Sequence, residues 1–85
     1  MTFQAEAVIT PRAGVLDTQG KAVEKTLKNL GYVQVDNVRV GRIVTMRIDA
    51  ESSTAAEAAV KEMCQDLLAN DLVETYKISV REIKS

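Results

Sequence analysis

Residues 11–20, which read Pro-Arg-Ala-Gly-Val-Leu-Asp-Thr-Gln-Gly, constrain the fold of this chain more than any other stretch of its 85 residues. The segment follows a strand-like alternation of apolar residues and precedes a helical periodicity. Proline donates no hydrogen bond to a sheet, so the preceding strand must end at Pro11. These residues therefore predict a tight strand–helix junction, and junctions of this kind often carry function.

Three other segments show the alternation of apolar and polar residues, or the β-branched residues, that are typical of strands. Residues 3–10 and 74–83 each predict one half-buried strand. Residues 33–50 predict two strands joined by a hairpin turn at Gly41-Arg42, where glycine supplies a positive φ. In that register three apolar side chains share one face of the hairpin and form a candidate self-association surface: Val38, Val40 and Ile43.

Two segments carry apolar residues at helical spacing. The first covers residues 18–30 and has Asp17 or Thr18 as its N-cap. The second begins at a capping box with Thr54 as the N-cap and ends near Ala69. Its buried side is expected to contain Ala56, Val60, Met63, Cys64 and Leu67.

The predicted order of elements is β-α-β-β-α-β in a single α+β domain, residues 1–85. Right-handed crossovers convert this order into a ferredoxin-like fold, a four-stranded antiparallel sheet with both helices on one face. So short a chain buries a small core and usually needs an additional support. One cysteine and no histidine exclude an intrachain disulfide and a zinc site, which leaves a partner chain, identical or different, as the expected support.

Composition also limits the function. Without histidine there is no catalytic triad, and Cys64 lies in an apolar helical pattern typical of an inert core thiol. A net charge of −1 and only three aromatic residues argue against nucleic-acid binding. No apolar run is long enough to span a membrane, no signal peptide is visible, and the lone cysteine fits a cytoplasmic protein.

Residues 14–20 lack the lysine and the glycine spacing of phosphate-binding loops, and Asp17 at the helix start would repel an anion. Gly20 is harder to explain, because glycine in a helix costs up to about 1 kcal/mol relative to alanine. A second stretch of backbone passing close to Gly20 would account for the glycine, and in an assembly this backbone would belong to a partner protein. Arg39 and Arg42 at the predicted hairpin tip are either solvated or bind a partner carboxylate.

Five segments in register resemble the PurS family, the small subunit of phosphoribosylformylglycinamidine synthase: residues 14–23, 30–31, 38–42, 63–70 and 73–76. The resemblance covers residues 11–80. The family usually has proline where Thr18 and Asp71 stand here, both at helix boundaries where proline is replaceable.

The resemblance implies a cytoplasmic, non-catalytic subunit that forms a homodimer or larger assembly. It would join the large ligase subunit, PurL, to the glutaminase subunit, PurQ, so that ammonia passes between them in purine biosynthesis. ATP and magnesium are expected on the large subunit and no cofactor on this chain. The candidate contacts with partner subunits are Arg12, Gly14, Asp17, Gln19, Gly20, Arg39, Gly41 and Arg42.

Two other functions remain open from the residues alone. Small regulatory modules of ferredoxin-like fold also dimerise, and they often bind a small molecule near a glycine turn. A stand-alone enzyme using carboxylates is the third possibility, although the acidic residues are scattered without an evident catalytic pair.

Overall fold

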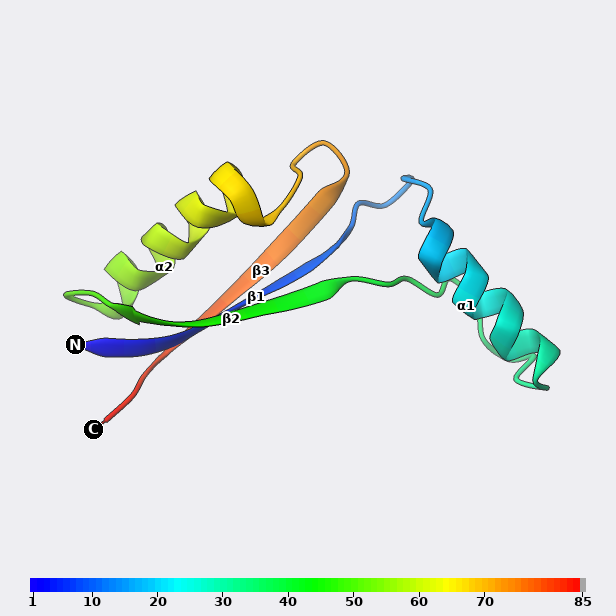
Figure 1. The fold of residues 1–85 in the computed structure, drawn as a ribbon, viewed down its shortest axis with the longest axis horizontal. Helices are drawn as coiled ribbons and strands as arrows, with labels where there is room; N and C mark the ends of the chain where they lie inside the picture. Colours follow the sequence, from blue (N-terminus) through cyan, green and yellow to red (C-terminus); the bar gives the residue numbers. More distant parts are fainter. Residues whose placement is uncertain (85) are drawn as a thin grey trace.

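A computed structural model describes residues 1–84 and shows a three-stranded antiparallel sheet in the order β2-β1-β3 (Figure 1). The central strand is β1 (Thr2–Pro11), flanked by β2 (Arg42–Asp49) and β3 (Glu74–Glu82). Helix α1 (Thr18–Asn29) follows β1, and helix α2 (Ser53–Met63) continues into a short π-helix, η1 (Cys64–Leu68), before β3.

The two faces of the sheet differ sharply in polarity. On one face of β1 the side chains of Phe3, Ala5, Ala7 and Ile9 are all buried, which confirms the predicted alternation. The register places Ala5 between Met46 of β2 and Val80 of β3, so apolar residues line up across all three strands. The other face is polar apart from Val8 and Ile43, which lie opposite each other.

The predicted fourth strand is not formed in the part of the chain that the structure describes. Residues 33–41 have no strand, and Asn37 takes a positive φ of 50°, which interrupts an extended backbone. The hairpin turn expected at Gly41-Arg42 is also wrong, because Arg42 opens β2 opposite Ile9 of β1. Gly41 instead passes close to β1, where a Cβ would overlap the carbonyl oxygen of Ile9.

Helix α1 does not lie on the sheet, so the prediction of two helices on one face is wrong as well. Figure 1 shows α1 beyond the end of the sheet, while α2 covers its apolar face. The radius of gyration is 16.4 Å, against about 12 Å for a compact chain of this length. The chain is therefore an α+β protein with two parts, a sheet–helix body and a projecting arm formed by α1 and residues 30–41.

The helix ends follow local capping chemistry. Asp17, one of the two predicted candidates, is the N-cap of α1, and its side chain accepts a hydrogen bond from the Gly20 N–H. The N-cap of α2 is Ser52 rather than Thr54, and its Oγ accepts from the Ala55 N–H at 3.1 Å. Ser and Thr are both good caps, and the one nearer the preceding strand starts the helix two residues earlier than expected.

Three of the five residues predicted for the buried side of the second helix are buried in the structure. Ala56, Val60 and Cys64 are buried, whereas Met63 is partly exposed and Leu67 is 83% exposed. In η1 the Ala69 N–H donates to the carbonyl of Cys64, five residues earlier, which widens the turn. The wider turn brings Leu68, not Leu67, against the core.

Candidate functional site

The junction after β1 is held against the loop that precedes β3. The Arg12 N–H donates to the carbonyl of Val73 at 2.8 Å, and its side-chain Nε donates to the carbonyl of Asp71 at 2.7 Å. The chain then turns, with the Val15 N–H donating to Arg12 and with Gly14 at a φ of 84°. That φ is in the left-handed region that glycine tolerates best, so the predicted constraint on this segment is real.

Asp17 connects the start of α1 to the returning chain. One carboxylate oxygen accepts from the Gly20 N–H at 2.9 Å and the other accepts from the Val40 N–H at 2.8 Å. These two hydrogen bonds, with a smaller contribution from the nearby Arg39, lower the pKa of Asp17 below its ordinary value. Both oxygens of this carboxylate therefore accept hydrogen bonds from nearby backbone N–H groups.

Glu24, on the next turns of α1, does the same for Val38. Its Oε1 accepts from the Val38 N–H at 3.1 Å, and its Oε2 lies 3.5 Å from the ammonium of Lys28. The hydrogen bond from Val38, and to a lesser extent the charge of Lys28, lowers the pKa of Glu24. Residues 38–40 are thereby held along α1 by two of its acidic side chains.

Gly20 is the point where these two segments come closest. It is buried, and a Cβ at this position would overlap the carbonyl oxygen of Val38 and crowd the Asp17 carboxylate. The predicted close approach of a backbone at Gly20 is confirmed. The approaching backbone belongs to the same chain and not to a partner.

Arg42 and Glu74 join the first residues of β2 and β3. The Arg42 guanidinium makes two hydrogen bonds to the Glu74 carboxylate, at 2.5 and 3.0 Å, and a third to the carbonyl of Leu68. The Asn70 N–H also donates to Glu74, at 2.8 Å. The bond from Arg42, followed by that from Asn70, lowers the pKa of Glu74. The carboxylate that Arg42 binds is thus within its own chain.

Two adjacent clefts meet at the junction. The first, the junction cleft, has a volume of about 450 Å³ and is lined by Pro11, Val15, Leu16, Asp17, Thr18, Gln19, Val40, Gly41, Arg42, Val73 and Glu74. The second, the cation cleft, has a volume of about 250 Å³ and is lined by Arg12, Ala13, Gly14, Val15, Leu16, Asp17, Lys21, Glu24, Asn37, Val38 and Arg39.

The structure brings together most residues that the sequence singles out as partner contacts. Every one of them except the buried Gly20 lines one of the two clefts: Arg12, Gly14, Asp17, Gln19, Arg39, Gly41 and Arg42. The three residues proposed for self-association do not gather in the same way. Val38 and Val40 lie against α1, whereas Ile43 is 59% exposed on the polar face of the sheet.

The predicted partner contacts leave out several residues that line the clefts, among them two on α1 and two at or beside the start of β3, outside the junction segment 11–20. Lys21 and Glu24 line the cation cleft, although the sequence does not single them out as partner contacts. Val73 and Glu74 line the junction cleft, whereas the sequence places Glu74 at the start of a strand and both residues in the segment that resembles the family. The available signal was the resemblance of residues 73–76 to the family pattern.

The arrangement is suited to binding rather than to acid–base chemistry. The carboxylates of Asp17, Glu24 and Glu74 accept hydrogen bonds from backbone N–H groups or cations, and these bonds stabilise their ionised forms. Cys64 lies in the core, as predicted, and burial raises the pKa of its thiol. Within residues 1–84 no group of side chains is arranged to hold a metal ion, and no helix is long and apolar enough to cross a membrane.

The family model for PurS, described as phosphoribosylformylglycinamidine (FGAM) synthase, matches residues 4–82, nearly the whole chain. The chain belongs to the PurS family. Among curated relatives, the synthase subunit PurS of Bacillus subtilis is 35% identical over 81 residues, covering 95% of each chain. The PurS subunit of Archaeoglobus fulgidus is 37% identical and covers 92% of this chain and 98% of its own length.

Solved PurS structures share the arrangement described above. Thermus thermophilus PurS superposes with a TM-score of 0.85 at 38% identity, covering 99% of this chain and all of the other. A chain in the structure of PurLQS from Thermotoga maritima gives a TM-score of 0.86 at 27% identity, covering 95% and 99% of the two chains. The projecting arm is therefore compatible with the family fold.

Proposed function

We propose that this chain is the small, non-catalytic subunit of an FGAM synthase in purine biosynthesis, acting in the cytoplasm. The observation that carries the proposal is the end-to-end match with the PurS family, residues 4–82. The site supports it, because the clefts at the junction present side chains for contact and their carboxylates are occupied by the local backbone. The PurLQS structure from Thermotoga maritima names the kind of assembly that this subunit would enter.

In such an assembly the chain would hold the ligase subunit and the glutaminase subunit together. Ammonia released by the glutaminase is protonated in water at neutral pH and is then no longer a nucleophile. Excluding water along its path keeps it reactive. ATP and magnesium would bind the large subunit, and this chain would contribute order to the assembly rather than a reacting group.

The chain would act as a homodimer, and the projecting arm supplies the reason. Helix α1, which lies beyond the end of its own sheet (Figure 1), carries an apolar stripe around Val23 and Leu27, and Val23 is 41% exposed. The sheet has a matching vacancy, because α2 packs on β1 and β3 and leaves Val44 and Met46 of β2 partly exposed. A second copy could place its α1 over β2, restoring two helices on one sheet face.

Reconstitution tests the proposed function. The ligase and glutaminase subunits of the source organism are purified and assayed for glutamine-dependent and ammonia-dependent synthesis, with and without this chain. We expect the chain to restore glutamine-dependent synthesis and to change ammonia-dependent synthesis little. Equal glutamine-dependent rates with and without the chain would show that it is not the missing subunit.

A further inference from the structure

We propose that the junction surface, defined by Arg12, Lys21 and Arg39 with Val15, Leu16 and Val73, binds a segment of a partner subunit that combines an acidic with an apolar side chain. The inference rests on the proposed function and adds the chemistry of the partner segment. The observation behind it is that the three cations line the cation cleft, whereas exposed apolar side chains line the junction cleft.

The cation cleft has unpaired positive charge. Within residues 1–84, Arg12, Lys21 and Arg39 form no ion pair, although all three line this cleft. The hydrogen bonds of the two acidic residues beside them go to other groups, since Asp17 binds Gly20 and Val40 and Glu24 binds Val38 and Lys28, although the charges of Arg39 and Lys21 also act on these carboxylates. The cleft therefore has a net charge of +1 in a chain whose overall charge is −1. A carboxylate on a partner fits this charge.

The junction cleft next to it is apolar at its rim. Leu16 is 68% exposed and Val73 is 40% exposed, and both line this cleft together with Val15. Exposed apolar side chains beside a cleft of about 450 Å³ offer a place for one large apolar side chain of a partner. Val15 and Leu16 line both clefts, so one short segment can reach the apolar rim and the cations together.

Arg12 and the backbone that carries Arg39 are also held in place within the chain itself. Arg12 is fixed through its backbone to Val73 and through Nε to Asp71, and neither of its two Nη atoms makes a hydrogen bond within residues 1–84. Residues 38–40, which carry Arg39, are fixed on α1 by Asp17 and Glu24. A surface ordered in this way loses little conformational entropy on binding, which favours affinity.

A protein segment suits this surface better than a free phosphate does. A phosphate dianion would lie close to the carboxylates of Asp17 and Glu24, whose lowered pKa values keep them ionised at neutral pH. A single carboxylate carries less charge, and the exposed Leu16 and Val73 add apolar contact that phosphate cannot use. The inferred ligand is thus an acidic peptide segment.

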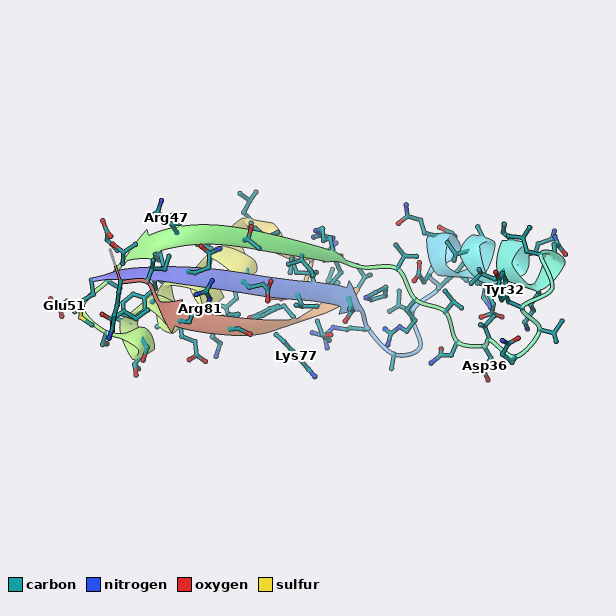
Figure 2. The ribbon with its side chains drawn as sticks, turned by 90° about the horizontal axis from the view of Figure 1, so that it is seen from below. Tyr32, Asp36, Arg47, Glu51, Lys77 and Arg81 are labelled. Atoms are coloured by element: carbon teal, nitrogen blue, oxygen red, sulfur yellow. The ribbon has the colours of Figure 1, made fainter. Side chains whose placement is uncertain are left out.

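The test measures binding of the full chain to the purified ligase and glutaminase subunits at several salt concentrations. The variant reverses the three cations, Arg12→Glu, Lys21→Glu and Arg39→Glu. The matched control reverses three cations on the polar face of the sheet, Arg47→Glu, Lys77→Glu and Arg81→Glu, which lie on the strands away from the arm (Figure 2). The net charge change is the same in both. We expect the junction variant to bind about tenfold more weakly and with less salt dependence, and the control to bind as the wild type does.

A second variant, Arg12→Gln with Lys21→Gln and Arg39→Gln, guards against misfolding, and circular dichroism should show native helix content in all variants. Failure of the wild-type chain to bind either subunit would contradict the proposed function itself. Wild-type binding that both junction variants retain in full would overturn this inference alone. The inference also fails if the junction variants lose only self-association by sedimentation. A rise in melting temperature with inorganic phosphate that these variants abolish would assign the surface to a small anion instead.

Discussion

At the residue scale, Asp17 caps α1 and holds Val40 with the same carboxylate. Asp17→Asn keeps one acceptor oxygen and replaces the other with a donor, so one of the two hydrogen bonds is lost. We expect the melting temperature at neutral pH to fall by about 5 °C. Because the folded pKa of Asp17 is lower than its ordinary value of 3.8, its stabilising contribution is complete above that value and is lost as the pH falls through the folded pKa.

Thermal unfolding of wild type and Asp17→Asn from about pH 7 to about pH 3 checks this sign. Glu24 and Glu74 titrate in the same acidic range in both proteins, so the difference between the two curves isolates Asp17. The difference should shrink at the acidic end. A constant difference across the range would show that the ionised carboxylate is not what stabilises the junction.

Gly20 tests packing at the same scale. In an exposed helix, glycine to alanine stabilises by about 1 kcal/mol, so helix propensity alone favours Gly20→Ala. Here the added Cβ would overlap the carbonyl of Val38, and we expect a loss of about 1–3 kcal/mol instead. Urea unfolding measures the sign directly, with Lys25→Gly, on α1 outside the apolar stripe, as the control for propensity. Stabilisation by Gly20→Ala would mean that residues 38–40 are not held on α1.

At the scale of elements, η1 decides which leucine supports the core. Leu68 packs against the cluster around Val60 and Cys64, whereas Leu67 is 83% exposed. We expect Leu68→Ala to lower the free energy of unfolding by about 1–3 kcal/mol and Leu67→Ala to change it by less than about 0.5 kcal/mol. The pair of urea unfolding curves, at one protein concentration, makes the comparison. Equal losses would indicate a regular α-helical turn in which both residues share the burial.

Local patterns predicted the elements that depend on local contacts. The alternation of Phe3, Ala5 and Ala7 located β1, and the side chain of Asp17 located the start of α1. The strand expected in residues 33–40 does not form. Its β-branched residues are typical of a strand, but the backbone N–H groups of Val38 and Val40 donate to the side chains of Glu24 and Asp17 instead of to a neighbouring strand. The same hydrogen bonds bring residues 38–40 next to the start of α1, where these two segments line the clefts. Most of their lining residues were predictable from the junction, but their meeting with Val73 and Glu74 depends on the sheet register.

At the scale of the whole molecule, the periodicity of the sequence correctly predicted the apolar stripe of α1. The predicted fold wrongly placed that stripe on the sheet of the same chain. An amphipathic helix must bury its stripe, but the pattern does not specify whether the covering surface lies in the same chain. Helix α1 lies beyond the end of its own sheet, and the chain is elongated, with principal extents of 50, 29 and 14 Å (Figure 1). The covering surface in the proposed dimer is the sheet of a second copy.

This arrangement makes a specific prediction about self-association. Val23→Asp places a charge in the stripe of α1, and we expect it to weaken the homodimer by tenfold or more, because an unpaired charge in an apolar contact is costly to desolvate. Lys25→Asp on the same helix, outside the stripe, is the control and should leave the dimer intact. Ile43→Asp, on the polar face of the sheet, tests the self-association surface predicted from the sequence. Sedimentation equilibrium of the three variants distinguishes the two surfaces. Loss of the dimer in Val23→Asp alone supports the arm as the interface, and loss of the dimer in Ile43→Asp alone supports the polar sheet face. A monomeric wild type would exclude both.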